Sequence, residues 1–250
     1  MAAPIFSYIR SFALSMTQRV VPNTSPSFIP DPEQDLSFRP QTVFPRPEQP
    51  LVLEIGCGIG DFILPLATSR PDVNFLAIDI YNQGCLKTCR KIDAAGLDNV
   101  RVMRIEARHL IARYLDPWSL AAIYINCPDP WPKKRHRERR LVNADFLEVV
   151  RFALKPGGEL FFASDVADYA EEVSALIVAQ CGFIRLTPEP YCIELQPDYP
   201  ISKYMRRFLE LGQPIHFVRL RRQNNEVEPP QTRPSAVRAG FRVRRETIGK

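Results

Sequence analysis

The sequence predicts an α/β fold, with a doubly wound and mostly parallel sheet that has helices on both faces. Short apolar runs typical of buried strands alternate with segments of helical periodicity. Acidic residues also follow four of the predicted strands, at Asp79, Glu106, Asp129 and Asp165. Because such sheets bind ligands beyond the carboxyl ends of their strands, four acids on one rim predict a site there.

The predicted elements follow one another without an internal repeat. The first strand spans 51–55, and a glycine-rich turn joins it to a helix over 61–69, in which Pro65 delays the start or produces a kink. The other predicted strands are 74–78, 100–105, 121–125, 159–163 and a closing strand over 217–220. The other predicted helices are 84–95, 144–154 and 169–181.

Prolines mark the start of the folded part. Eight prolines lie between residues 22 and 50, which indicates extended or disordered chain. We therefore predict a flexible, proline-rich N-terminal extension over 1–48, one globular domain over 49–222, and a basic, disordered tail over 223–250.

Composition argues against several classes of protein. No apolar run approaches the roughly 20 residues of a membrane helix. The six cysteines are scattered, and with only three histidines no metal-ligand spacing occurs, so we expect no metal site. Reduced cysteines favour a cytoplasmic protein. Residues 1–21 lack the long apolar core of a secretory signal, but their composition leaves an organelle transit peptide open.

Positive charge is concentrated in two places, although the net charge is only +5. Residues 133–140 hold six basic side chains against Glu138, and residues 203–250 hold twelve. Such clusters are typical of a surface that binds a polyanion such as nucleic acid. For the C-terminal cluster, an ordinary solvated surface remains an alternative.

The turn after the first strand indicates which cofactor the rim would bind. Its spacing, Glu54-x-Gly56-x-Gly58-x-Gly60, does not fit the G-x-G-x-x-G of dinucleotide sites, and it lacks the Lys-Ser/Thr of a P-loop. Acids flank the turn, which suits a cofactor with an ammonium and a sulfonium better than a pyrophosphate. Asp79, 23 residues beyond Gly56, has the place of a carboxylate that binds ribose hydroxyls.

This arrangement resembles the class I S-adenosylmethionine-dependent methyltransferases, whose Rossmann-like sheet is of a seven-stranded type. The resemblance implies S-adenosylmethionine as the cofactor, with Glu106 near the adenine ring. A divergent NAD site is the rival interpretation of the turn, and an ordinary strand-end acid is the rival for Glu106. The implied cofactor-binding residues are Glu54, Gly56, Gly58, Gly60, Asp79, Glu106 and Asp129.

The run from Asn126 to Leu141 is more specific. Read as N-x-P-D-P-W-x-K-x-R-H-x-x-R-R-L, it resembles the tRNA (guanine-N7)-methyltransferases, which methylate a guanine in the tRNA variable loop. The resemblance extends over about 51–222 and implies that Asp129, held between two prolines, is catalytic. The implied substrate positions are Lys133, Asp165, Ser202, Lys203, Tyr204 and Met205, and the implied RNA contacts are Arg135, His136, Arg137, Arg139 and Arg140.

One departure from the family pattern leaves alternatives open. The family's T-K-[FY]-E segment is here Ser202-Lys203-Tyr204-Met205, so a carboxylate able to bind the guanine edge is missing. One alternative is a paralogue that binds cofactor and RNA without turnover. Another is an RNA methyltransferase with a different base target, because the run also loosely resembles the [DN]-P-P-[YFW] of amino-methylating enzymes. We expect tRNA as the partner, and a monomer or a homodimer is compatible with the sequence.

Overall fold

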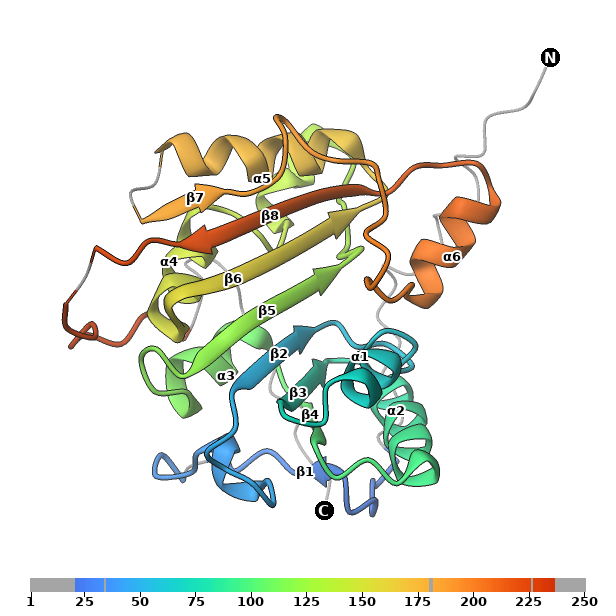
Figure 1. Ribbon diagram of the computed structural model, residues 1–250, viewed down its shortest axis with the longest axis vertical. Coiled ribbons are helices and arrows are strands. Elements are labelled where there is room, and N and C mark those ends of the chain that lie inside the picture. Colours follow the sequence, from blue (N-terminus) through green and yellow to red (C-terminus); the bar gives the residue numbers. More distant parts are fainter. Residues whose placement is uncertain (1–20, 34, 180–181, 226, 237–250) are drawn as a thin grey trace.

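The computed structural model describes residues 21–33, 35–179, 182–225 and 227–236, which form one sheet with helices on both faces (Figure 1). The strands are β1 (Phe28–Ile29), β2 (Leu51–Ile55), β3 (Asn74–Asp79), β4 (Val100–Arg104), β5 (Leu120–Asn126), β6 (Leu154–Ser164), β7 (Phe183–Arg185) and β8 (His216–Arg222). The α-helices are α1 (Ile63–Ser69), α2 (Asn82–Ala95), α3 (Ala107–Tyr114), α4 (Ala144–Ala153), α5 (Ala167–Ala179) and α6 (Lys203–Glu210). Two 3-10 helices are η2 (Pro40–Val43) and η3 (Lys134–Arg139).

The strand order is β1-β4-β3-β2-β5-β6-β8-β7. All pairings are parallel except those of β8, which runs antiparallel to β6 and β7. The chain builds outward from β2 through β3 to β4 and then returns to add β5 on the other side of β2. This reversal places a topological switch point at the carboxyl ends of β2 and β5, where ligands of such sheets bind. The predicted α/β, mostly parallel fold is confirmed.

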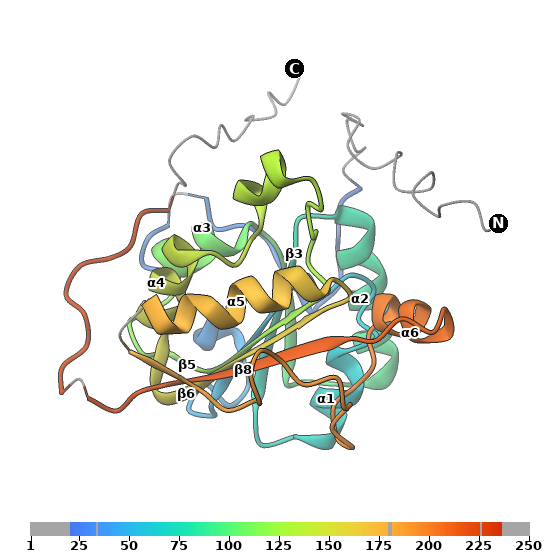
Figure 2. The same ribbon diagram turned by 90° about the horizontal axis from the view of Figure 1, so that it is seen from above.

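Alternating side chains of the strands fill two hydrophobic layers. Leu53 and Ile123 point to the layer that α3, α4 and α5 cover, whereas Val52 and Tyr124 point to the layer that α1 and α2 cover. Figure 2 shows α3, α4 and α5 on one side of the sheet and α1 on the other. Because Glu54 and Asn126 are two residues beyond Val52 and Tyr124, they lie on the α1 and α2 side, at the rim.

Six short elements were not predicted from the sequence: β1, η2, η3, α3, β7 and α6. Helix α3 begins directly after Glu106, whose carboxylate caps it by accepting a hydrogen bond from the His109 backbone N–H (2.8 Å). Pro65 lies in the first turn of α1, where a missing N–H removes no helical hydrogen bond. The helix therefore begins at Ile63, two residues later than predicted.

The described part of the proline-rich stretch, which was expected to be flexible, contacts the domain at several points. It is extended, but β1 pairs with β4 at the edge of the sheet, where prolines are tolerated. Ser25 and Ser27 donate to the two carboxylate oxygens of Asp93 on α2 (2.7 and 2.6 Å), and the Tyr114 hydroxyl donates to the Glu33 carbonyl (2.8 Å). These partners are far away in sequence, so only the folded domain shows where the stretch binds. Residues 1–20 lie outside the described chain.

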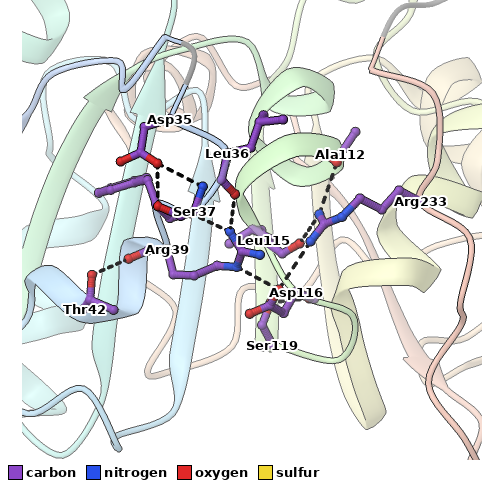
Figure 3. Close-up of polar contacts among 11 residues, drawn as sticks. Asp35, Leu36, Ser37, Arg39, Thr42, Ala112, Leu115, Asp116, Ser119 and Arg233 are labelled. Atoms are coloured by element: carbon purple, nitrogen blue, oxygen red, sulfur yellow. Dashed lines mark hydrogen bonds and ion pairs between the residues drawn. The ribbon is translucent and has the colours of Figure 1, made fainter.

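The N-terminal stretch and the C-terminal tail meet at Asp116, just after α3 (Figure 3). Arg39 Nε lies 2.7 Å from Asp116 Oδ1, and Arg233 Nη2 lies 3.3 Å from the same oxygen. Arg233 also donates to the Ala112 and Leu115 carbonyls, which are left free at the end of the helix (3.2 and 2.8 Å). The described part of the tail therefore packs on the domain, against the prediction of a disordered tail. Residues 237–250 lie outside the described chain.

In the described ranges, no helix is both long and apolar enough to cross a membrane. The same ranges contain no group of three or more His, Cys, Asp or Glu side chains arranged to hold a metal ion.

Candidate active site

The glycine-rich turn folds back over the end of β3. The Gly56 and Cys57 N–H groups both donate to the Ile78 carbonyl (2.8 and 3.0 Å). The Gly58 N–H donates to Asp79 Oδ2 (2.8 Å), and the Tyr81 N–H donates to Asp79 Oδ1 (2.9 Å). Asp79 thus joins the turn to the start of α2, and the predicted cofactor residues of β2 and β3 come together at one rim.

Backbone geometry explains the glycines. Gly56, Gly58 and Gly60 have φ values of 82°, 54° and 81°, which side-chain-bearing residues rarely adopt. A fourth glycine, Gly84 of α2, was not singled out from the sequence because it lies within a predicted helix. A Cβ on Gly84 would lie 2.5 Å from the Gly58 carbonyl oxygen, so α2 approaches the turn at a distance that only glycine permits.

Glu54 is the only predicted site acid that is fully buried, with 1% of its surface exposed. Its Oε2 has no hydrogen-bond partner in the described chain. Burial, and next the charge of Asp79, raise the Glu54 pKa to about 8, and the neighbouring Asn126 amide opposes this rise. Asn126 Oδ1 accepts a hydrogen bond from the Tyr199 hydroxyl (2.7 Å). A buried, unpartnered carboxylate oxygen is suited to an ammonium donor.

Two other acids at the rim have structural partners. Asp61 pairs with Lys91 of α2 and lies 3.7 Å from Arg206 of α6, so it links these two helices. Glu106 is exposed at the rim and caps α3 as described above. One of its carboxylate oxygens accepts the hydrogen bond from His109. This contact supports the alternative interpretation of Glu106 as an ordinary acid at a strand end.

Asp129 lies in the signature loop, by which we mean residues 126–141. The loop leaves β5 through Cys127, whose N–H donates to the Ala163 carbonyl (2.8 Å). Cys127 and Trp131 have φ values of 47° and 42°, so residues on both sides of Asp129 adopt the left-handed conformation that is costly for side-chain-bearing residues. The Asp129 side chain is exposed, yet surrounding atoms remove part of its hydration, and this together with the Asp79 charge raises its pKa.

Asp165 follows the neighbouring strand β6 and is half-buried. Loss of hydration raises its pKa, and the His216 side chain opposes this rise. His216 is buried on β8, where its Nδ1 lies 3.1 Å from the Ser164 carbonyl oxygen. Asp165 and Asp129 therefore project from adjacent strand ends.

The basic part of the signature loop divides into exposed and buried residues. Lys133, Lys134, Arg135 and Arg139 are exposed on and beside η3. The Arg139 guanidinium lies over the Trp131 ring at 5.0 Å from its centroid, and the His136 ring meets the edge of the same indole. Trp131 therefore packs within the loop.

The prediction that Arg140 contacts RNA is wrong, because its side chain is completely buried. Arg140 pairs with Asp168 and Glu172 of α5, and Arg137 pairs with the other oxygen of Asp168. Asp168 and Glu172 were not among the predicted site residues. The sequence signal for them is the acidic start of α5, which carries Asp168, Glu171 and Glu172.

The prediction that Met205 binds substrate is also not supported by its position. Ser202 caps α6 by accepting from the Met205 N–H (3.3 Å), and Lys203 and Tyr204 are exposed. The Met205 side chain is 0% exposed and packs with Ala163 and Ile215. A carboxylate at this position would lie unpaired in an apolar cluster, so methionine is the residue that anchors α6 here.

Comparisons with known proteins agree on one kind of enzyme. A family model described as "Putative methyltransferase" matches residues 48–218. A protein of Syntrophotalea carbinolica named tRNA (guanine-N(7)-)-methyltransferase is 52% identical over 228 residues, which cover 91% of this chain and 97% of the relative. A protein of Geobacter metallireducens with the same name is 45% identical over 206 residues, covering 82% of this chain and 97% of the relative.

Solved structures support the fold alone. The 16S rRNA methyltransferase KamB aligns with a TM-score of 0.50 at 16% identity, covering 70% of this chain and 88% of KamB. The antibiotic-resistance methyltransferase Kmr also has a TM-score of 0.50 at 16% identity, covering 71% of this chain and 88% of Kmr.

Proposed function

The chain belongs to the tRNA (guanine-N7)-methyltransferase family, and from this premise we propose that it transfers the methyl group of S-adenosylmethionine to N7 of a guanine in the tRNA variable loop. One observation carries the proposal most directly. Glu54, buried with an unpartnered oxygen, shares a rim with Asp79 and Asp129, and the same loop that carries Asp129 presents exposed basic residues.

The residues at the rim fit the cofactor. When bound, S-adenosylmethionine supplies an electrophilic methyl group on its sulfonium. Glu54 is suited to its ammonium group, Asp79 to its ribose hydroxyls, and Gly56 and Gly58 permit close approach of the backbone. Glu106 lies at the far side of the rim, where its carboxylate would border the adenine.

The protein's part in the reaction is positioning and control of charge. Guanine N7 presents a lone pair and loses no proton on methylation, so no strong base is needed. Orientation of the reactants can supply up to about 7–11 kcal/mol of the barrier. Asp129 stabilises the positive charge that the base acquires, and Asp165 provides a second acceptor for the guanine N1–H and amino groups. Asp129 thus acts on the charge of the base and takes no proton from N7.

RNA binding falls to the exposed part of the signature loop. Lys133, Lys134 and Arg135 lie on the same loop as Asp129, so phosphates that they bind bring RNA to the rim. Such contacts give affinity and salt dependence, whereas a base displaced from its stack enters the site itself. Lys203 and Tyr204 on α6 provide further exposed groups beside the cofactor turn.

A direct test is incubation of the purified protein with methyl-labelled S-adenosylmethionine and bulk tRNA, followed by nucleoside analysis. We expect 7-methylguanosine, and cleavage mapping at this nucleoside should place it in the variable loop. Labelled N6-methyladenosine would instead support the alternative base target. Cofactor and tRNA binding without transfer would support the inactive paralogue.

Replacing Lys134 and Arg135 together by alanine should weaken tRNA binding at physiological salt. Each lost phosphate contact should lower the slope of log affinity against log salt by about one. Binding measured at several salt concentrations checks this. The control is the exposed Lys155, at the start of β6 and so at the opposite end of the strands, replaced by alanine. An unchanged slope in the double variant would contradict the role of the loop in RNA binding.

Cofactor binding should depend on pH through Glu54. Its pKa of about 8 means that Glu54 is protonated at lower pH in the free protein, so binding an ammonium requires loss of that proton. Affinity should therefore rise by up to about tenfold per pH unit and level off above about pH 8. Calorimetry with S-adenosylhomocysteine, which carries the same ammonium, in buffers of different ionisation enthalpy measures both the profile and the proton released. A flat profile without proton release would contradict the role.

Action in the cytoplasm is part of the proposal. The described cysteines, Cys57, Cys85, Cys89, Cys127 and Cys192, are all free thiols, which is typical of a reducing compartment.

A further inference from the structure

Arg140 is a buried cation with every side-chain nitrogen engaged. Its Nε donates to the Pro130 carbonyl (2.9 Å), its Nη2 to Asp168 Oδ1 (2.6 Å), and its Nη1 to Glu172 Oε2. The guanidinium also lies over the Tyr169 ring, 4.6 Å from the centroid. A buried charge is costly unless it is paired and hydrogen-bonded, so these four partners explain how Arg140 can be fully buried.

These contacts fix the signature loop at two points to one helix. Pro130 is the residue directly after Asp129, and Arg140 is ten residues further along, beyond η3. Asp168 and Glu172 are four residues apart on α5 and therefore face the loop together. The hydroxyl of Tyr169, between them, accepts from the Val142 N–H (2.9 Å), just past the loop. The guanidinium thus connects the backbone beside Asp129 to α5.

The loop needs such a support because its conformation is strained. Cys127 and Trp131, on either side of Asp129, have positive φ values, and strained backbone persists only where surrounding contacts enforce it. Pro130 has no backbone N–H, so its carbonyl is its only backbone hydrogen-bonding group, and Arg140 donates to it. Without that contact, the segment that carries Asp129 has less to hold it in place.

We propose that Arg140 is a positioning residue for methyl transfer, which holds Asp129 in place through the Pro130 carbonyl while α5 holds Arg140. This inference rests on the proposed function and deepens it. The basic run then has two tasks: exposed residues such as Arg135 bind RNA, and buried Arg140 sets the geometry of the acid. Replacing these two classes of residue should affect different kinetic steps.

Arg140→Lys tests the proposal, because one ammonium cannot bind the Pro130 carbonyl and both α5 carboxylates in the geometry of a guanidinium. We would measure the single-turnover rate at saturating tRNA and cofactor, the tRNA dissociation constant at several salt concentrations, the cofactor dissociation constant, and the thermal midpoint. We expect the rate to fall by about 10- to 100-fold, because displacing a reacting group by about 1 Å can cost that much. Both dissociation constants and the salt slope should stay as in the wild type.

Two controls separate positioning from its alternatives. Arg135→Ala should weaken tRNA binding and lower the salt slope, which is the signature of a lost RNA contact and is not expected for Arg140→Lys. Arg222→Lys alters another buried arginine, which donates to the Leu154 carbonyl at the start of β6, the end of that strand away from the rim. It should lower the thermal midpoint without lowering the saturated rate of the folded enzyme.

Asp168→Asn keeps the proposal testable if Arg140→Lys does not fold. It preserves shape and the Pro130 contact but weakens the pairing of Arg140 with α5, so a smaller fall in rate at constant tRNA affinity is expected. A wild-type rate in a folded Arg140→Lys protein would overturn the proposal. So would a reduced salt slope like that of Arg135→Ala, which would make Arg140 an RNA contact. A wild-type protein that forms no 7-methylguanosine would refute the proposed function itself and the inference with it.

Discussion

Asp129→Ala should lower the rate of methyl transfer by about 10²–10³-fold, the usual effect of removing one group that stabilises developing charge in a transition state. The carboxylate stands at the rim beside Asp79, where loss of hydration strengthens its interaction with a cationic base. The substitution should leave the thermal stability of the fold unchanged. Asp129 is exposed, and its side chain forms no hydrogen bond or ion pair in the described chain.

The measurement is single-turnover methylation of tRNA at saturating cofactor, with circular dichroism and thermal melting to check the fold. Asp129→Asn keeps the shape and should lose most of the rate, since charge is the property that matters. Asp72→Ala is the matched control, because Asp72 is an exposed acid before β3, at the opposite end of the strands. Turnover at the wild-type rate in Asp129→Ala would remove the proposed role.

Glu54→Gln should weaken cofactor binding by about 2–5 kcal/mol, the range for truncating one partner of a buried charge pair. This corresponds to a loss of affinity of roughly 30-fold or more. Glutamine has nearly the same volume as the protonated glutamate that the free protein holds below pH 8, so the site keeps its shape. The variant should also lose the dependence of cofactor affinity on pH, because it removes the group that titrates.

The same substitution predicts a change in stability with a defined sign. The Glu54 pKa is raised by folding from 4.5 to about 8, so this group makes the wild-type protein less stable as pH rises through that window. Glu54→Gln should remove this loss, and the variant should melt higher than the wild type at pH 8 without cofactor. Glu148→Gln, at an exposed position on α4, is the control. Wild-type cofactor affinity with an unchanged pH profile would show that another group binds the ammonium.

Met205 shows how a residue-by-residue likeness can mislead. From the sequence, its place in a family motif suggested a substrate contact and a missing carboxylate. In the structure its side chain lies among Ala163 and Ile215, beneath α6, because the strong amphipathicity of this short helix turns that position inward. The substitution therefore belongs to the packing of α6 and no longer supports loss of guanine recognition.

The proline-rich stretch shows a different limit. Prolines indicate that a segment is not an ordinary helix or central strand, but they do not show what it packs on. The partners of Ser25, Ser27 and Arg39 are Asp93 and Asp116, which are more than 60 residues away in sequence. Pairings over such distances follow from the folded arrangement of the sheet and carry no local signal.

The sequence by itself determined the alternation of strands and helices, the acids at the strand ends and the family motif of the signature loop. These features are local: hydrophobic periodicity, glycines that permit positive φ, and prolines beside Asp129. Only the tertiary structure decided which charges face solvent. Arg135 and Arg140 look equivalent in a basic run, yet the carboxylates of α5 make burial of Arg140 favourable and leave Arg135 exposed. Charge in a sequence therefore predicts a polyanion surface, whereas burial and pairing determine which of its members hold the site in place.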